Sequence, residues 1–152
     1  MSIQKMDLEK AARSMTGLQQ LQAVIAGKVP PPTIAKTLDF TLKEIAHGKA
    51  VFEGTPSEQH LNPVGTVHGG YAATLLDSAL GCSVHTVLEP GEGYTTVDLN
   101  VKYIRALKPG MGKVLAIGEI VHKGRKIATA DARLVGEDGK LYATGTTTCI
   151  IL

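Results

Sequence analysis

Within sixteen residues the chain carries a side-chain amide, a His-Gly-Gly motif and a carboxylate. Groups of these types at this spacing could form a catalytic site. These residues are Asn62, His68-Gly69-Gly70 and Asp77. Asp77 interrupts a run that is otherwise apolar at helical spacing, between Leu76 and Leu80. An ionised carboxylate is unfavourable in apolar surroundings unless something compensates its charge. Asp77 therefore either reaches solvent or is held in place for a reaction.

A glycine pair at the start of a helix suits the stabilisation of negative charge on a substrate. The first N–H groups of a helix have no partner within it, and they lie at the positive end of the helix dipole. Gly69 and Gly70 have no side chain, so a substrate could approach this backbone closely. The carboxylate of Asp77 could accept a proton from water as a general base. Together these groups suit a reaction that forms an oxyanion and consumes water.

The spacing of Gly69 and Asp77 places a constraint on such a site. The two residues are eight positions apart, which is about 12 Å along one straight helix. A carboxylate must come within about 3 Å of the group it serves, so one subunit cannot readily bring both residues to a single substrate. Two antiparallel copies of the helix, related by a two-fold axis, could do so. This geometry predicts that a homodimer is required for activity.

The elements that must position these residues follow from the hydrophobic periodicity. Apolar residues recur at helical spacing over 7–26, and Gly27 and Pro30-Pro31-Pro32 end that pattern. The alternation then changes to that of a hairpin between about 38 and 52. Residues 55–67 read as a loop and 69–88 as a helix. The predicted strands that follow span about 94–105, 112–122, 126–136 and 140–151.

The order of these elements predicts an α+β fold. Strands joined by short turns, such as Lys123-Gly124 and Asp138-Gly139, are antiparallel and exclude a doubly wound parallel sheet. The helix over 69–88 is apolar nearly all round, which is typical of a buried helix. The predicted architecture is a curved antiparallel sheet of about six strands wrapped around one long central helix, with an additional N-terminal helix.

Composition excludes several classes of function. The chain has 152 residues, 43% of them apolar and 20% charged, with a formal net charge of +2. This charge does not indicate nucleic acid binding. No apolar run is long enough to span a membrane, and Met1–Lys10 lacks the apolar core of a signal peptide. Cys82 and Cys149 fit reduced core residues, so a cytoplasmic protein is expected. The remaining histidines show no metal-ligand spacing, and no metal is expected.

The motif and its surroundings resemble the hotdog-fold thioesterases, specifically the phenylacetate-degradation (PaaI-like) branch of the 4-hydroxybenzoyl-CoA thioesterase superfamily. The most specific matches are Asn62, Gly65, His68-Gly69-Gly70 and Leu76-Asp77-Ser78. Val97-Asp98-Leu99-Asn100-Val101 with Tyr103 and the Lys123-Gly124-Arg125 turn match more weakly. The resemblance covers about 33–151 and implies two parts, namely 1–32 as N-terminal helix and Pro-rich connector and 33–152 as hotdog thioesterase domain.

The resemblance implies hydrolysis of acyl-CoA thioesters without a metal or cofactor, since coenzyme A is part of the substrate. It implies a hotdog dimer, and two such dimers forming a homotetramer. The Gly69 N–H would polarise the thioester carbonyl, with Gly70 beside it, and Asp77 would act as general base or nucleophile. Asn62 would position water or substrate, and His68 would shape the loop or bond near the thioester. Thr96 would support the carboxylate. Some relatives carry a Thr one turn after the acidic residue, where this chain has Gly81.

Two further interpretations and one set of residues stay open. His68 with Asp77 resembles the His and acidic pair of hotdog dehydratases or hydratases, although the glycine pair and Asn62 do not fit those families. A non-catalytic acyl-CoA-binding module is the other interpretation. Lys123, Arg125 and Lys126 could bind the phosphates of coenzyme A, or they could be ordinary surface residues.

Overall fold

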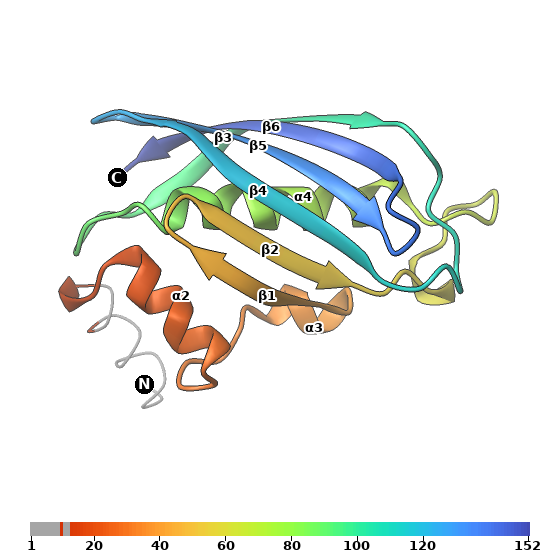
Figure 1. Ribbon diagram of the computed structural model, residues 1–152, viewed down its shortest axis with the longest axis horizontal. Helices are drawn as coiled ribbons and strands as arrows, with labels where there is room; N and C mark the ends of the chain where they lie inside the picture. The colour runs from red at the N-terminus through yellow and green to blue at the C-terminus, as the bar shows by residue number, and fades with distance from the viewer. Residues whose placement is uncertain (1–9, 11–12) are drawn as a thin grey trace.

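The structure is a computed structural model that describes residue 10 and residues 13–152. One six-stranded antiparallel sheet curves around a long helix (Figure 1). The strands are β1 (Phe40–Ala46), β2 (Lys49–Gly54), β3 (Tyr94–Tyr103), β4 (Val114–Lys123), β5 (Ile127–Gly136) and β6 (Leu141–Ile151). Their order across the sheet is β1-β2-β4-β5-β6-β3. This is the predicted fold class, and the predicted hairpin and later strands are confirmed within a few residues at their ends.

The long helix α4 (Gly69–His85) lies in the hollow of the sheet (Figure 1). Its fully buried side chains include Leu75, Leu76 and Leu80, which form the centre of the hydrophobic core. Gly118 of β4 faces the helix, and a Cβ there would overlap the carbonyl oxygen of Ala79. This glycine therefore lets α4 and the sheet approach each other closely. The expectation of a buried central helix is confirmed.

The N-terminal region breaks where a continuous helix was predicted. The prediction of one helix over 7–26 is wrong at Thr16, which caps a separate helix, α2 (Gly17–Ile25), in a capping box with Gln19. Residues 7–9, 11 and 12 of that prediction lie outside the described residues. A Cβ at Gly17 would overlap the His85 carbonyl oxygen, so a glycine there lets the start of α2 approach the end of α4 closely. The Gly17 N–H also donates to the Leu88 carbonyl at 3.0 Å.

Two short helical turns were not predicted from the sequence. α3 (Thr33–Thr37) follows the proline-rich connector, and the 3-10 turn η1 (Glu58–His60) lies in the loop before α4. Both are a few residues long, too short for hydrophobic periodicity to reveal. In the part of the chain that the structure describes, no helix has both the length and the apolar character needed to cross a membrane.

Candidate functional site

The first turn of α4 is built by the His68-Gly69-Gly70 motif. His68 is the N-cap, with φ −58° and ψ 135°, and its Nδ1 accepts a hydrogen bond from the Gly70 N–H at 2.8 Å. A Cβ on residue 70 would lie 2.9 Å from this Nδ1. Gly70 therefore makes room for the imidazole to fold back onto the backbone. The motif is a specific local structure, not only a flexible entry to the helix.

Gly69 presents one open donor and one occupied acceptor. Within the described residues its N–H has no hydrogen-bond partner, as is usual for the first residue of a helix. Its carbonyl oxygen accepts a hydrogen bond from the Tyr103 hydroxyl at 2.8 Å. The predicted oxyanion donor is thus available. Tyr103 was part of the weaker motif but was not predicted as a site residue.

Asp77 lies two turns further along α4, and Thr96 of β3 lies beside it. The Thr96 hydroxyl donates to Oδ1 of Asp77 with an O–O distance of 3.3 Å. The pairing of β3 with β6 shifts register between Thr96 and Asp98, and such an irregularity changes the direction in which a strand side chain points. Asp77 itself is half-buried, so its carboxylate has access to the outside of the chain.

Tyr94 occupies the space beside Gly81, one turn after Asp77. A Cβ at Gly81 would lie 3.1 Å from the Tyr94 hydroxyl oxygen and 3.2 Å from Cε2. The Tyr94 ring meets the His85 ring edge-on, with centroids 5.5 Å apart. Burial raises the pKa of the Tyr94 hydroxyl, and the neighbouring Cys82, Cys149 and Asp77 add to that rise. The absence of a Thr at position 81 was visible in the sequence, but the residue that fills its place was not.

The two cysteines near Asp77 are poor nucleophiles. Burial raises the pKa of the Cys82 thiol to about 12, and the charge of Asp77 contributes to the rise. Burial likewise raises the pKa of Cys149, although its hydrogen bond with Thr147 opposes the shift. The thiolate is the reactive form of cysteine, so both side chains stay protonated and unreactive near neutral pH.

Asn62 uses its side chain to hold its own loop. Its Oδ1 accepts from the Val64 and Thr66 N–H groups, both at 3.1 Å, and its Nδ2 donates to the Thr66 hydroxyl at 2.8 Å. The structure shows no hydrogen bond between Asn62 and Asp77 in the described chain. The loop that Asn62 organises leads to His68, whose N–H donates to the His60 carbonyl at 2.7 Å. The role predicted for Asn62 on water or substrate stays a prediction.

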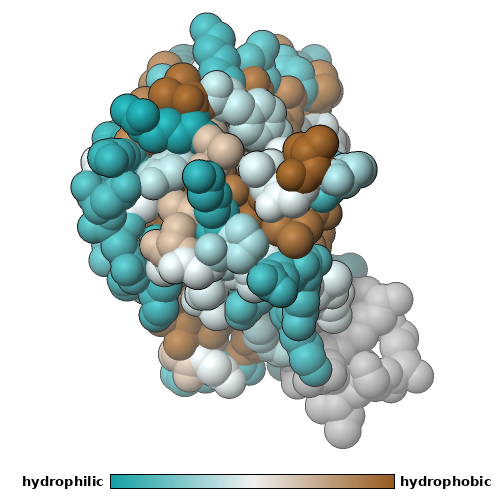
Figure 2. All heavy atoms as spheres, turned by 90° about the vertical axis from the view of Figure 1, so that its right-hand side faces the viewer, coloured by the Kyte–Doolittle hydropathy of each residue, from teal (hydrophilic) through white to brown (hydrophobic). Residues whose placement is uncertain are grey.

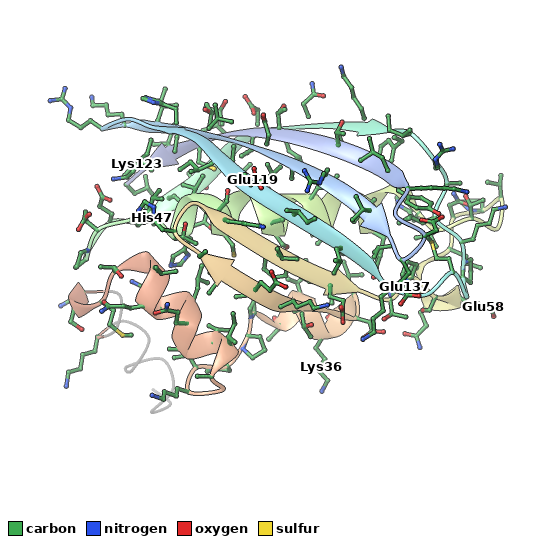
Figure 3. The ribbon with its side chains drawn as sticks, in the orientation of Figure 1. Lys36, His47, Glu58, Glu119, Lys123 and Glu137 are labelled. Atoms are coloured by element: carbon green, nitrogen blue, oxygen red, sulfur yellow. The ribbon has the colours of Figure 1, made fainter. Side chains whose placement is uncertain are left out.

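The basic turn between β4 and β5 lies at the other end of the molecule from Gly69. Figure 3 shows Lys123 far from Glu58, which belongs to the loop that leads into α4. The Lys123 ammonium pairs with Glu92, just beyond the C-terminal end of α4, at 2.9 Å, while Arg125 and Lys126 are exposed. One chain therefore does not bring these residues to its own Gly69. Their role in binding phosphate stays a prediction.

A cavity of about 260 Å³ opens beside the start of α4. Its lining comes from four regions of the chain, and it includes Val67, His68, Gly69, Tyr103, Leu134 and Tyr142. Figure 2 looks at this end of the molecule, where separate hydrophobic patches interrupt a largely hydrophilic surface. The cavity combines apolar walls with a few polar groups, as is typical of sites for small molecules.

Comparison with known proteins agrees with this geometry. The model of the thioesterase superfamily matches residues 64–143, slightly more than half of the chain. The chain is 35% identical to mouse (Mus musculus) acyl-coenzyme A thioesterase 13 over 138 residues, which are 87% of this chain and 93% of the relative.

Solved structures of thioesterases are also similar to this chain. Zebra fish thioesterase superfamily member 2 superposes with a TM-score of 0.74 at 32% identity, over 90% of this chain and 99% of that one. The phenylacetic acid degradation protein PaaI of Thermus thermophilus superposes with a TM-score of 0.71 at 31% identity, over 78% of this chain and 98% of that one. Since these likenesses extend over the fold and the His-Gly-Gly helix start, the chain belongs to the thioesterase superfamily and is a thioester hydrolase of hotdog fold.

Proposed function

We propose that this protein hydrolyses acyl-CoA thioesters to a free acid and coenzyme A. The observation that carries the proposal is the open N–H of Gly69 at the start of a buried helix, beside a cavity and on the same helix as Asp77. The coenzyme A part of the substrate is inferred from the named activity of the mouse relative, acyl-coenzyme A thioesterase 13.

In the proposed reaction Asp77 accepts a proton from a water molecule that attacks the thioester carbonyl carbon. The carbonyl oxygen becomes an oxyanion, which the Gly69 N–H and the positive end of the α4 dipole stabilise. The C–S bond then breaks, and the coenzyme A thiolate leaves and takes up the proton that Asp77 accepted, which restores the carboxylate. The Thr96 hydroxyl holds the Asp77 carboxylate in one orientation through its 3.3 Å hydrogen bond. Direct attack by Asp77 on the carbonyl carbon is the alternative first step.

This reaction requires neither a metal ion nor a cofactor, because the protein groups alone perform both tasks. The proposal therefore predicts that removing divalent ions with a chelator leaves turnover unchanged. A strict requirement for an added metal ion would contradict it.

We propose that the active unit is a dimer formed across β3. This strand is at the edge of the sheet, and most of its residues are exposed. Large apolar side chains of this region are exposed to solvent: Val97 is 55% exposed, Tyr103 56%, and Ile104, just beyond the strand, 52%. An open strand edge of this kind is a template for pairing with another chain. A two-fold axis at β3 would lay the two α4 helices antiparallel, with each Asp77 toward the partner's Gly69.

The same two-fold arrangement supports a role for the basic turn. The turn between β4 and β5, which carries Lys123, Arg125 and Lys126, lies at the far end of the chain from the start of α4 in Figure 1, and Figure 3 labels Lys123 there. In an antiparallel dimer, the turn of one subunit approaches the Gly69 end of the other. These residues would then bind the phosphates of a coenzyme A whose thioester lies at the partner's helix start. Pairing of two such dimers into a tetramer remains a prediction.

The His68 ring favours hydrolysis over the dehydratase interpretation. A catalytic histidine base must present an unprotonated nitrogen to the substrate. Here Nδ1 accepts the Gly70 N–H, so the ring proton is on Nε2, the nitrogen that remains available. In this state the ring can donate a hydrogen bond from Nε2, but it has no unprotonated nitrogen to act as a base there. No feature of the described residues specifically favours a non-catalytic acyl-CoA-binding module.

The experiment that tests the proposal is release of free thiol from a panel of aryl and aliphatic acyl-CoAs. The wild-type protein should turn over at least one of them. Asp77→Asn, which keeps the size of the side chain, should lower kcat by about a hundredfold or more. Circular dichroism and light scattering must show that the variant keeps its fold and oligomeric state. Equal turnover by both proteins would contradict the mechanism, and tight acyl-CoA binding without turnover would favour the binding module.

A further inference from the structure

Tyr103 and His68 are connected through a single peptide group. The Tyr103 hydroxyl donates to the Gly69 carbonyl oxygen at 2.8 Å, and the Gly70 N–H donates to His68 Nδ1 at 2.8 Å. The carbonyl of Gly69 and the N–H of Gly70 are the two ends of the same planar peptide unit. A hydrogen bond at the oxygen of a peptide strengthens its N–H as a donor. The phenol therefore supports the bond that caps the helix.

The contact between Tyr103 and Gly69 is close and anchored on both sides. A Cβ at Gly69 would lie 3.1 Å from both Cζ and the hydroxyl oxygen of Tyr103, so the ring packs directly on the helix backbone. On the other side, Tyr103 is the last residue of β3 and pairs with Ala143 in β6. The N–H groups of the next two residues, Ile104 and Arg105, both donate to the Tyr142 carbonyl, at 2.8 and 3.1 Å. The sheet thus fixes the position of the phenol.

The bond to the Gly70 N–H assigns the protonation of the His68 ring. Because Nδ1 is the acceptor, the proton is carried by Nε2. Among the described residues Nε2 has no partner, and His68, which is exposed, is among the residues that line the cavity beside Gly69. His68 and Gly69, which both line this cavity, each carry a donor without a partner among the described residues, the Nε2–H of one and the N–H of the other. A thioester carbonyl developing negative charge would gain from both.

We propose that Tyr103 is a positioning residue that, through the Gly69–Gly70 peptide, keeps His68 as an Nε2–H donor to the substrate carbonyl. This inference rests on the proposed thioester hydrolysis for its kinetic consequence, but not for the state of the ring. It assigns His68 a hydrogen-bonding role and excludes it as the base. It also gives Tyr103 a role that acts on the chemical step, since the donor bond strengthens as the oxyanion forms.

The state of the ring is measured by nitrogen-15 NMR of histidine-labelled protein. A protonated and an unprotonated ring nitrogen have well separated chemical shifts, and His68→Gln identifies the signals of His68 among the five histidines. The wild type should show the proton on Nε2. Tyr103→Phe removes only the hydroxyl and should shift the His68 signals toward a mixture of the two tautomers. Tyr142→Phe is the matched control, because Tyr142 lines the same cavity but its hydroxyl donates to Asp138, and it should leave the His68 signals unchanged.

The kinetic arm uses Tyr103→Phe with the best acyl-CoA. We expect kcat to fall about tenfold while KM changes less than about threefold. The reason is that the hydroxyl of Tyr103 acts on the substrate only through His68, whose hydrogen bond to the carbonyl is strongest in the transition state. The carbonyl of Gly69 keeps its place in the hydrogen-bond ladder of α4, so the variant should fold normally.

The outcomes separate this inference from the proposed function. A wild-type ring protonated on Nδ1 would overturn it even if the enzyme hydrolyses acyl-CoAs. Ring signals or a kcat that do not respond to Tyr103→Phe would overturn it as well. If the wild type turns over no thioester, the kinetic consequence fails together with the proposed function, whereas the ring measurement still decides whether Tyr103 controls His68.

Discussion

The hydroxyl of Thr96, on the edge strand β3, donates to the carboxylate of Asp77 on the central helix. This is the direct link between the strand and the carboxylate that the proposed mechanism uses. It predicts different consequences for two substitutions at one position. Thr96→Ser keeps the hydroxyl and should retain kcat within about threefold, whereas Thr96→Val keeps the shape and should lower kcat about tenfold. Steady-state kinetics on the best acyl-CoA checks this. Equal activity of the two variants would mean that the bond is structural only.

A second relationship, between Gly81 and Tyr94, should be visible in stability. Gly in a helix interior is less favourable than Ala by about 1 kcal/mol, so Gly81→Ala would ordinarily stabilise α4. Here the new Cβ would lie 3.1 Å from the Tyr94 hydroxyl oxygen, and the His85 ring holds Tyr94 in place. We expect Gly81→Ala to destabilise the wild type but to stabilise Tyr94→Val. Urea unfolding of the four proteins measures this coupling, and a Gly81→Ala effect of the same sign in both backgrounds would contradict it.

Much of the fold follows from local sequence patterns. β4, β5 and β6 alternate along their length and are joined by Gly-containing turns, and the helix over Gly69–His85 is apolar on nearly every side. What local patterns do not contain is the order of strands. β3 pairs with β6 and not with β4, its nearest neighbour in sequence, because the chain crosses over the sheet before β4 begins. The break at Thr16 was also hidden, since apolar spacing continues across it.

The contacts of the candidate site likewise fall into some that local sequence predicts and others that depend on how distant segments pack. The start of α4 at the glycine pair was predicted from local residues, but the N-cap bond of His68 to the Gly70 N–H was not. The Thr96–Asp77 bond joins residues 19 apart and was expected only from the family resemblance. Tyr103 lies 34 residues from Gly69, and its contact depends on where β3 ends against β6. Nothing in the spacing of the two residues indicates that contact. For Asn62 the motif predicted a contact with water or substrate, whereas the hydrogen bonds that its side chain makes in the structure lie within its own loop.

Docking of α2 on the C-terminal end of α4 should depend on pH. The His85 ring bonds to Gln20 of α2 at 3.0 Å, and burial lowers the pKa of this imidazole in the folded protein. In the unfolded chain a His takes up its proton near pH 6.5. The contribution of His85 to stability is therefore fully present above about pH 6.5 and is lost as the pH falls below it, through the folded pKa. The unfolding free energy should drop between pH 7 and pH 5, and it should drop less steeply in His85→Gln. Identical slopes would contradict this.

The Gly69 N–H can be removed without adding a charge or a long side chain. Gly69 is the first residue of α4, a position where Pro is well tolerated, and His68 already has the extended backbone (φ −58°, ψ 135°) that Pro requires of its predecessor. Gly69→Pro should fold and lower kcat by about a hundredfold or more, as for loss of an oxyanion donor. Gly69→Ala is the control, since it brings the same Cβ toward Tyr103 but keeps the N–H. Equal losses in the two variants would assign the effect to crowding and not to the N–H.

These variants also test whether two subunits share one site. Asp77→Asn and Gly69→Pro should each be nearly inactive, but a mixed dimer would combine the intact Asp77 of one chain with the intact Gly69 of the other. The separation of about 12 Å between these residues along one α4, at about 1.5 Å per residue, is the reason to expect this. Random mixing of the two proteins by unfolding and refolding should restore about one quarter of the wild-type activity, since half of the dimers are mixed and each has one intact site. If both groups of a site came from the same chain, mixing would restore nothing, and the two-fold arrangement proposed for β3 would be wrong.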